Sequence, residues 1–599
     1  MLGERSDQRG LLEADHLYLD HVGRESFYGF LASMRGELFR DEEFAELYCA
    51  DNGRNSVPPS VVATALLLQT YDKVSDAEAK RRAAFDIQWK VALGIEVEDR
   101  PFAKSTLQLF RAHLILHDKV RDIFQRSIQI ARQSGYLKGR RMKVALDTTN
   151  ILGRGAVKDT YNLLADGIVQ LIGALAKVDK EKAEEWGSGH GFKGYFGSSV
   201  KGESGIDWDS KKERQAFLQQ IVADADRLLE LARQGQRGFE VDSPERKQII
   251  EAGELLGRLL LQDVERKEEG ATLKDGVSRD RIPSVHDPEM RHGRKSRSKR
   301  FDGHKAGIAV DTDSQLVTAV DVLPGNAPDN KGALDLVEQS EQNTGLEAEE
   351  TIGDAAYGDG ATRQAFADAE RALIANVPAR PNKAYFPKED FKIDPEAGAC
   401  TCPAGNVTHT LRRMGARTGR SGQTYPAQSF QFDGAVCGGC PLRPECVAAR
   451  DGKGRTVSLH PQEALLQQAR ALQHSEAFDE YRKRRQVVEH RLARLVQLGL
   501  RQARYFGRTK TLFQLLMAAT VANLTLVAGK AGLMSKPPGF SLSIFGQRLT
   551  SSLINTGRSA LSVANSIGVR LRAILPPFLL PDHSRVEHPI TQRPFQPDF

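Results

Sequence analysis

The stretch "KVALDTTNILG", residues 143–153, decides how the rest of the chain is interpreted. Its short apolar run, residues 144–146, predicts a buried β-strand. The run ends on Asp147, and two threonines and an asparagine follow. An aspartate after a strand often only turns the chain, so Asp147 is either a turn residue or a functional carboxylate. The sequence on both sides has to decide between these two interpretations.

The overall composition is that of a globular protein. Of 599 residues, 40% are apolar and 27% are charged. The first twenty residues carry charges throughout, unlike a signal peptide. Residues 511–529 carry no charge and are barely long enough to cross a bilayer, but Gln514 and Asn523 within them favour a buried helix. We therefore expect a cytoplasmic protein with no membrane partner.

Positive charge gathers in two segments, although the net charge is only +6. Residues 481–510 contain ten Lys or Arg and one acid, Glu489, and residues 291–305 contain seven Lys or Arg and one acid. One such cluster is commonly a solvated surface, whereas two in one chain favour a polyanionic partner such as nucleic acid. The residues that we expect to contact DNA are Arg484, Arg485, Arg491, Lys510, Arg297, Lys299, Arg300, Lys80 and Arg81.

The first 135 residues are predicted to be helical. Two prolines at residues 58–59 fit the start of a helix. Residues 75–78 and 105–108 each fit the S-x-x-E/Q capping box that precedes a new helix. The short turn before the second helix, together with its cations at residues 80–82, is compatible with a helix-turn-helix DNA reader or with an ordinary helical bundle. Cys49 is expected to be a small packed residue.

Downstream of Asp147 the sequence pattern changes twice. Residues 156–290 are mostly helical and interrupt the core. Two apolar runs within residues 303–323 then predict a hairpin, followed by a helix, a short strand that ends at Asp354, a second helix and a strand at residues 373–378. An antiparallel hairpin combined with parallel crossover strands predicts a mixed α/β sheet covered by helices.

Three carboxylates are expected to converge at this sheet. Asp147 and Asp354 both end strands, and the strand ends of α/β sheets are where ligands gather. Glu489 stands alone among cations on a helix, beside an apolar stripe that begins at Val488. Converging carboxylates repel one another unless cations neutralise them, and Mg²⁺ or Mn²⁺ suits such an oxygen-only site. The alternative for Glu489 is a surface ion pair with Arg485.

Five of the six cysteines lie close together in the sequence. Cys437 and Cys440 have the C-x₂-C spacing of two thiolates on one metal, and Cys446 follows soon after. With Cys402 they would complete a tetrahedral, structural Zn²⁺ site, and reduced thiols without metal are the alternative. In a cytosolic protein zinc is favoured over a disulfide. We expect Cys400 to be a bystander.

At this point the sequence resembles a known family. The stretches "ALDTTN", "GHKAGIAVDTDSQLVTAVDVLPGNAPD", "TIGDAAYGDG" and "RRQVVEHRLARLVQLGL" are similar to those of DDE-type transposases of bacterial insertion sequences, whose catalytic core is ribonuclease H-like. The resemblance covers most of residues 40–530. It implies that Asp147, Asp354 and Glu489 are the catalytic triad, with Asp359 as the nearest rival for the second position. Many relatives also place a tyrosine on the last helix, where Tyr481 here stands one residue early.

The resemblance also implies an activity and partners. The triad would hold two Mg²⁺ or Mn²⁺ ions for phosphoryl transfer, which cuts double-stranded DNA at the element's ends and joins those ends to target DNA. Two ends must be joined, so a homodimer or higher oligomer on DNA is expected. The expected location is the bacterial cytoplasm, at the nucleoid when DNA is bound.

The predicted organisation has seven parts. They are an N-terminal helical domain (1–135), the first core strand (136–155), a helical insertion (156–290), core strands with the second aspartate (291–380), a Cys-rich insertion (381–455), core helices with Glu489 (456–536) and a Pro-containing tail (537–599). Two other functions stay open from the sequence. One is a ribonuclease H-like nuclease that cuts without joining, and the other is a zinc-stabilised DNA-binding protein without catalysis.

Overall fold

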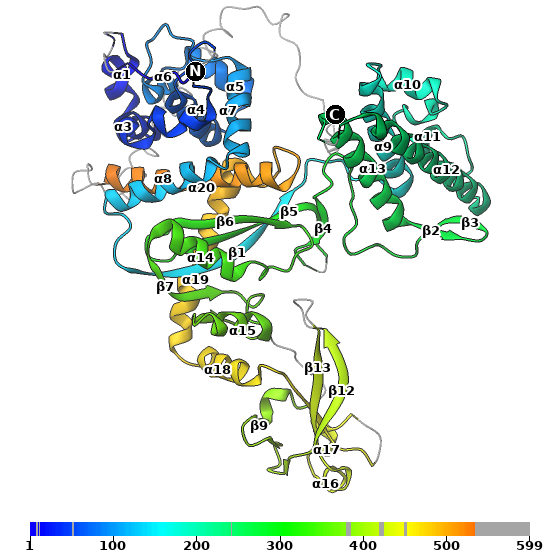
Figure 1. Cartoon of the computed structure of the whole chain (residues 1–599). Coiled ribbons are helices and arrows are strands. Elements are labelled where there is room, and N and C mark those ends of the chain that lie inside the picture. Colours follow the sequence, from blue (N-terminus) through cyan, green and yellow to red (C-terminus); the bar gives the residue numbers. More distant parts are fainter. Residues whose placement is uncertain are drawn as a thin grey trace, which may run out of the picture. The chain divides into compact units, whose positions relative to one another are not determined.

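The computed structural model describes residues 1–6, 10, 12–50, 53–240, 242–296, 298–378, 385–418, 424–448 and 452–533. The predicted C-terminal tail and Arg297 lie outside these residues. Figure 1 shows a mixed α/β chain with helices before the first strand and a mixed sheet after it.

The chain begins with a helical region, as predicted. Its elements are α1 (Ala14–Val22), α2 (Phe27–Ser33), α3 (Arg35–Leu38), the 3₁₀ turn η1 (Asp41–Leu47), α4 (Pro59–Asp72), α5 (Asp76–Phe85), α6 (Ile87–Leu93), α7 (Lys104–Leu116) and α8 (Val120–Gln133). Helix α4 starts at Pro59, and the Ser75 side chain accepts a hydrogen bond from the Glu78 amide at the start of α5 (3.2 Å). Both predictions are confirmed.

Two predictions for this region are wrong. Helix α7 already begins at Lys104, with Ala103 as its N-cap and no capping side chain, so Ser105 lies inside the first turn. Phe102 is buried and anchors the chain just before the helix, which begins at Lys104 and not at the serine. Cys49 is exposed and not packed, because the residues around it form a surface loop after η1.

The main sheet has six strands. They are β4 (Arg291–Arg294), β5 (Arg300–Asp311), β1 (Arg141–Leu152), β7 (Glu347–Gly353) and β8 (Leu373–Ala375) in that order, with β6 (Val317–Pro324) paired to β5. Strand β5 pairs antiparallel with β1 and β6, whereas β7 is parallel to β1 and β8. The predicted hairpin is therefore β5–β6. Helices α14 (Ala333–Thr344) and α15 (Gly360–Asp368) follow β6 and β7, as the pattern predicts.

Strand β1 corrects one prediction about the opening stretch. It does not end at Asp147 but continues to Leu152, because the whole strand stays hydrogen-bonded to β5 up to the pair Leu152 and Gly303. Only the parallel ladder to β7 stops early, at Ala145 and Ile352. Asp147 therefore lies inside β1, at a position where β1 is still paired with β5 but no longer with β7.

Two C-terminal helices cover the sheet and join it to the N-terminal region. Helix α19 (Ala477–Leu495) buries Val488, Leu492 and Leu495, and leads into a π turn, η5 (Val496–Leu500). The helix stops because Gly499 has a φ of 98°, a conformation that other residues rarely adopt.

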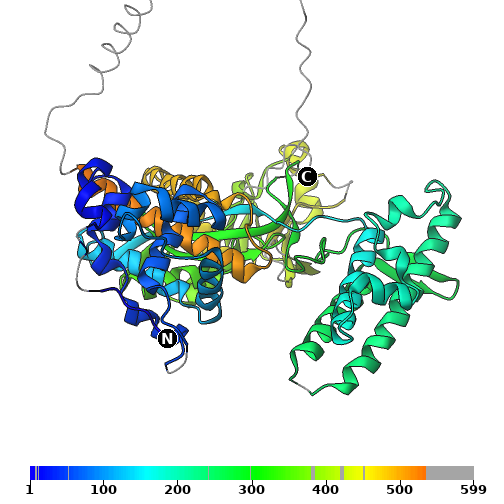
Figure 2. The same cartoon turned by 90° about the horizontal axis from the view of Figure 1, so that it is seen from above.

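Helix α20 (Arg508–Leu533) then runs beside the N-terminal helices, as Figures 1 and 2 show. Its Asn523 contacts both Ser127 of α8 and the backbone of Val317 in β6. Within the described residues, α20 alone is long and apolar enough to cross a membrane, and 72% of its most apolar window is buried. The prediction of a buried helix is confirmed, since α20 packs between two parts of the same core.

The segment between β1 and β4 forms its own small core. Its helices are α9 (Thr160–Val178), α10 (Ala183–Gly189), α11 (Val200–Glu203), α12 (Lys211–Gly235) and α13 (Pro244–Asp263), with the turns η2 (Lys193–Tyr195) and η3 (Gln236–Gly238) and a hairpin, β2 (Val264–Lys267) and β3 (Gly270–Leu273). Buried leucines and isoleucines of α9, α12 and α13 pack together there, separately from the main core. This packing explains why so long a segment can interrupt the sheet without disturbing it.

The Cys-rich segment forms a third, smaller core. Its elements are η4 (Lys388–Asp390), β9 (Lys392–Asp394), β10 (Ala399–Thr401), β11 (Val407–Thr408), β12 (Leu411–Thr418), β13 (Thr424–Gln431), α16 (Gly434–Gly438), α17 (Arg443–Cys446) and β14 (Thr456–Leu459), and α18 (Glu463–Gln473) leads back to α19. Two three-stranded sheets, β11-β10-β9 and β12-β13-β14, enclose a few aromatic residues such as Phe430 and Phe432.

Candidate active site

Neighbouring parallel strands bring the two aspartates together. The last parallel pair is Ala145 of β1 and Ile352 of β7, so Asp147 and Asp354 both lie two residues beyond it at one edge of the ladder. One carboxylate oxygen of Asp147 accepts a hydrogen bond from the Thr148 amide (2.7 Å). Asp354 likewise accepts one from the Ala356 amide (2.8 Å). These bonds orient the Asp147 carboxylate within β1 and the Asp354 carboxylate at the start of the turn that follows β7.

Glu489 reaches the same place from α19. The buried face of this helix packs on β1, β5 and β7. One guanidinium nitrogen of Arg485 donates to a carboxylate oxygen of Glu489 (2.5 Å), and the other lies 3.8 Å from an oxygen of Asp147. Arg485 therefore forms the ion pair with Glu489 that the sequence left as an alternative, and it also links Glu489 to Asp147. Half of the Glu489 side chain remains exposed.

The pKa of Asp147 responds to its burial and to the charges of the other two triad carboxylates. Burial is the main cause that raises its pKa, from 3.8 to about 6, and the charges of Asp354 and Glu489 raise it further. The Thr148 amide and the Arg485 guanidinium act in the opposite direction, because both favour the charged form. Three carboxylates lie around a single guanidinium, that of Arg485, and a perturbed pKa in such a cluster is typical of functional sites.

The raised pKa predicts how the metal-free protein responds to pH. Between pH 3.8 and about 6 the folded form holds more protons at Asp147 than the unfolded form, so stability falls as pH rises through this window and levels off above it. We expect Asp147→Asn to remove this loss. In EDTA at pH 8 the variant should be more stable than the parent by about 1–3 kcal/mol.

Thermal unfolding in EDTA at several pH values measures this effect. The stability difference between parent and variant should disappear only below about pH 3, where Asp147 is protonated in both the folded and the unfolded parent. Parallel pH profiles for the two proteins would show that Asp147 is an ordinary surface carboxylate.

A second group of residues at the site was missed by sequence reasoning. Lys305 of β5 donates to Asp329 (2.7 Å), and the Thr148 hydroxyl donates to the same carboxylate oxygen of Asp329 (2.8 Å). Tyr357 is almost fully buried, and its pKa is raised by burial and by the charges of Asp147, Asp329 and Asp354. The available signal was that Asp329, like Asp354, comes shortly after a strand.

Two further expectations are settled by contacts in this region. Lys305 was counted in a basic surface cluster, but it is buried because β1 and β6 flank it, and it pairs with Asp329. Asp359, the rival of Asp354, is the N-cap of α15 and accepts hydrogen bonds from the amides of Ala361 and Thr362 (2.9 and 3.0 Å). The other oxygen of Asp359 accepts hydrogen bonds from the Asn330 side-chain amide and the Thr362 hydroxyl. Structural contacts thus engage both of its oxygens, so the geometry favours Asp354.

The candidate metal ligands differ in how closely they gather. In the described part of the chain, one group of three possible ligand residues, Glu13, Asp15 and His16, brings its ligand atoms within 4.8 Å of one another. Asp15 of that group pairs with Arg35 (3.2 Å), which gives it a structural role. In the same described residues, neither the triad carboxylates nor any three of the four cysteine sulfurs gather that closely.

The four predicted zinc ligands line one small cavity. Cys402, Cys437, Cys440 and Cys446 surround a space of about 20 Å³, which is room for a single water-sized species. Burial raises the pKa of the Cys446 thiol, and the other three cysteines raise it further. Cys400, the expected bystander, is fully buried in β10 and does not line this cavity.

The predicted DNA-contact residues fall into two groups. Lys80, Lys299, Arg300 and Lys510 are exposed. Among the other described ones, Arg81 pairs with Glu78 (2.6 Å), Arg484 with Glu480 (3.1 Å) and Arg485 with Glu489 (2.5 Å). Arg491 is half-buried, and burial lowers its pKa. It therefore faces the protein, whereas the sequence predicted that it contacts DNA.

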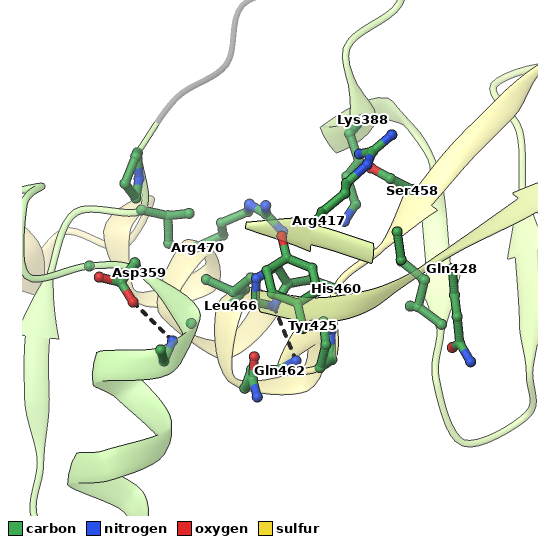
Figure 3. Close-up of a pocket in the computed structure, with 18 of the residues that line it drawn as sticks. Asp359, Lys388, Arg417, Tyr425, Gln428, Ser458, His460, Gln462, Leu466 and Arg470 are labelled. Carbon is green, nitrogen blue, oxygen red and sulfur yellow. Dashed lines mark hydrogen bonds between the residues drawn. The ribbon is translucent and has the colours of Figure 1, made fainter. Parts of the chain in front are cut away.

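A larger cavity lies next to the triad loop, not on the triad itself. It has a volume of about 460 Å³ and is bounded by the start of α15, the start of α18 and the strands β13 and β14. Figure 3 shows Asp359 on one side, with Arg417, Tyr425, His460 and Arg470 around the opening. Sequence reasoning missed this cavity because its walls come from several separate segments spread between Gly358 and Arg470.

Two protein families match this chain, one in its N-terminal region and one after residue 400. A family described as "Transposase domain (DUF772)" matches residues 18–113, which form the N-terminal helices. A family described as "Transposase DDE domain" matches residues 401–528, a range that includes Glu489 and follows the two aspartates. A search of curated proteins and one of solved structures found no match. Together, the two family matches indicate a DDE-type transposase of the insertion-sequence type.

Proposed function

We propose that this transposase cuts double-stranded DNA at the ends of its insertion sequence and joins those ends to target DNA. Asp147, Asp354 and Glu489 would hold two Mg²⁺ or Mn²⁺ ions, on a sheet that we assign to the ribonuclease H-like class. The single observation that carries the proposal is the meeting of these three carboxylates, from β1, β7 and α19, with Arg485 between two of them.

The chemistry of the donor set fits hard divalent cations. All three groups offer carboxylate oxygens, the ligands that Mg²⁺ prefers. The pKa of Asp147 is raised mainly by burial and then by the charges of Asp354 and Glu489. Arg485 contributes one positive charge to the site, whereas each divalent ion would contribute two. Bound ions would activate the attacking oxygen and stabilise the oxygen that leaves phosphorus.

The chain's own residues would position the ions' ligands and the DNA. The Thr148 and Ala356 amides orient the two aspartates. Lys305 and Thr148 hold Asp329 beside them, and this arrangement keeps its charge neutralised by the lysine. Arg485 would exchange its contact with Glu489 for a DNA phosphate when cations occupy the site, since guanidinium groups bind phosphate as well as carboxylate.

Zinc is the second part of the proposal. Four cysteines around one small cavity, in a segment whose core is only a few aromatic residues, fit a structural Zn²⁺ that supplies the missing folding energy. Arg455 supports this arrangement by donating to the backbone oxygens of Cys446 (2.7 Å) and Phe386 (2.8 Å).

The partners follow from the reaction. The substrate would be duplex DNA at the element's ends and at the target, bound by a homodimer or higher oligomer in the bacterial cytoplasm. Exposed Lys80, Lys299, Arg300 and Lys510 are available for phosphates without breaking ion pairs. The DNA that flanks the gene is the first probe to use, because inverted repeats there would mark the ends.

Glu489→Gln separates binding from chemistry. Without divalent metal, the charge of Glu489 repels phosphates, so in EDTA the variant should bind flanking-end DNA at least as tightly as the parent. In Mg²⁺ it should neither nick nor join the DNA, because one ion ligand is lost. Binding is measured by fluorescence anisotropy, and nicking and strand transfer on gels.

Glu480→Gln is the matched control on the same helix. Its side chain is exposed and pairs with Arg484, so the change in charge is identical but lies away from the triad. We expect it to keep normal activity. Joining by Glu489→Gln would place the third ligand elsewhere, and a parent that nicks DNA without joining it would favour the nuclease over the transposase.

A further inference from the structure

The hairpin of β12 and β13 presents an unusually open strand. All eight residues of β12, from Leu411 to Thr418, are exposed, and within the described residues this strand pairs with β13 alone. Figure 1 shows the two strands as a long ribbon that extends from the Cys-rich core. Open edge strands attract unwanted pairing, so proteins that keep one usually protect it or use it.

The ribbon also has a one-sided charge. No Asp or Glu occurs anywhere from residue 397 to residue 432, whereas this range contains Arg412, Arg413, Arg417 and Arg420. Arg420 lies outside the described residues. No side-chain hydrogen bond or ion pair engages the other three within the described chain, unlike Arg484 and Arg485 on α19. Their charges are therefore available to a polyanion.

A β-bulge aligns two of these arginines. Arg412 pairs with Ser429 and Arg417 with Tyr425, and the register shifts between Arg413 and Ala416. Five residues separate Arg412 from Arg417, so in a regular strand they would point to opposite faces. The extra residue of the bulge, accommodated by Gly415 with a φ of 76°, returns both to one face. Arg413 is left on the other face.

The aligned face leads into the cavity beside the triad loop. Arg417 and Tyr425 line that cavity together with Lys388 and Arg470 (Figure 3). On its opposite side lies Asp359, five residues after Asp354 in the same loop. Lys388 and Arg470 both pair with Glu463. Arg417 therefore brings the ribbon's unpaired charge to this cavity, which also borders the loop that carries a triad carboxylate.

We propose that the β12–β13 ribbon, through the face of Arg412 and Arg417, binds the phosphate backbone of duplex DNA whose reacting end lies at the triad. Its dimensions suit this role, since a two-stranded ribbon fits the major groove and arginine holds phosphate in a planar, two-point contact. The proposal rests on the proposed transposase function and adds a DNA-contact surface to it. The alternative is that the arginines only keep the open edge of β12 from pairing with another chain.

The test compares two double variants of the full-length protein. Arg412→Gln/Arg417→Gln removes the aligned pair, and Lys211→Gln/Lys212→Gln removes two exposed charges at the start of α12. Binding to a labelled random-sequence DNA duplex is measured in EDTA across a range of salt concentrations. The ribbon variant should bind more weakly, with a log–log salt slope shallower by about 1.8, or about 0.9 per lost phosphate contact. The α12 variant should keep the parent slope, and Arg413→Gln alone should change it by less than the ribbon pair.

Three results would overturn the inference. An unchanged slope in the ribbon variant, while the parent still cleaves flanking-end DNA in Mg²⁺, would remove the ribbon surface but leave the proposed function intact. An unchanged slope together with new self-association in light scattering would assign the arginines to edge protection. A parent that neither binds nor cleaves duplex DNA would overturn the proposed function and this inference together.

Discussion

Asp354→Asn is expected to abolish Mg²⁺-dependent nicking and joining while the protein stays folded. The substitution keeps the shape of the side chain but removes the charge that holds a cation. Metal stabilisation of a phosphoryl-transfer transition state is worth several kcal/mol, so activity should fall by a factor on the order of 10³ or more. Asp147→Asn should have the same effect, because its carboxylate lies at the same position on the neighbouring strand.

Asp359→Asn is the control for this prediction. It makes the same chemical change five residues further along the same loop. Asparagine is as good an N-cap as aspartate, so α15 should remain intact and activity should stay near that of the parent. Nicking and strand transfer are measured for all three variants on the same DNA. Full activity of Asp354→Asn with loss of activity in Asp359→Asn would exchange the two assignments.

Cys440→Ser is expected to remove zinc from the protein and to destabilise the Cys-rich segment. A structural site contributes its binding free energy to folding, roughly 10 kcal/mol or more in small zinc domains. The small core of this segment cannot replace it, because few apolar residues are buried there. Metal analysis should find about one zinc per parent chain and none in the variant, and limited proteolysis should cut the variant first within residues 385–459.

Two serine substitutions provide the matched controls. Cys400→Ser lies in the same small core but away from the cavity, and Cys49→Ser lies on an exposed loop. Both variants should retain zinc, although Cys400→Ser should lower stability, because it places a hydroxyl in a buried site. Parent protein purified without chelator that contains no zinc would favour the alternative of reduced thiols.

Local sequence patterns predicted local structure well. Pro59 starts α4 and Ser75 caps α5, since a fixed φ and a hydroxyl acceptor act within a single turn. The β5–β6 hairpin follows from two apolar runs joined by a short polar turn. The pattern failed at Ser105, where the burial of Phe102 set the start of α7 instead.

Contacts between segments far apart in the chain could not be predicted from the sequence. Arg491 was one of several cations on a basic helix, and only the packing of α19 shows that it faces the protein. The sequence placed Lys305 in a basic surface cluster, but its neighbours in the sheet bury it against Asp329. In both cases the charge was assigned to the surface because only the packing of distant elements shows that the residue is buried. For Lys305 that packing also supplies an ion-pair partner, Asp329.

The sequence by itself determined that the chain carries two aspartates and a glutamate on elements of an α/β core, and it identified the transposase family that the two matches support. It did so because strand, helix and cap signals act over a few residues. Only the tertiary structure decided that β1 runs on past Asp147, that Arg485 joins Glu489 to Asp147, and that Asp359 is a cap. Those outcomes depend on the strand register and on side-chain packing between distant segments, which the order of residues along the chain does not specify locally.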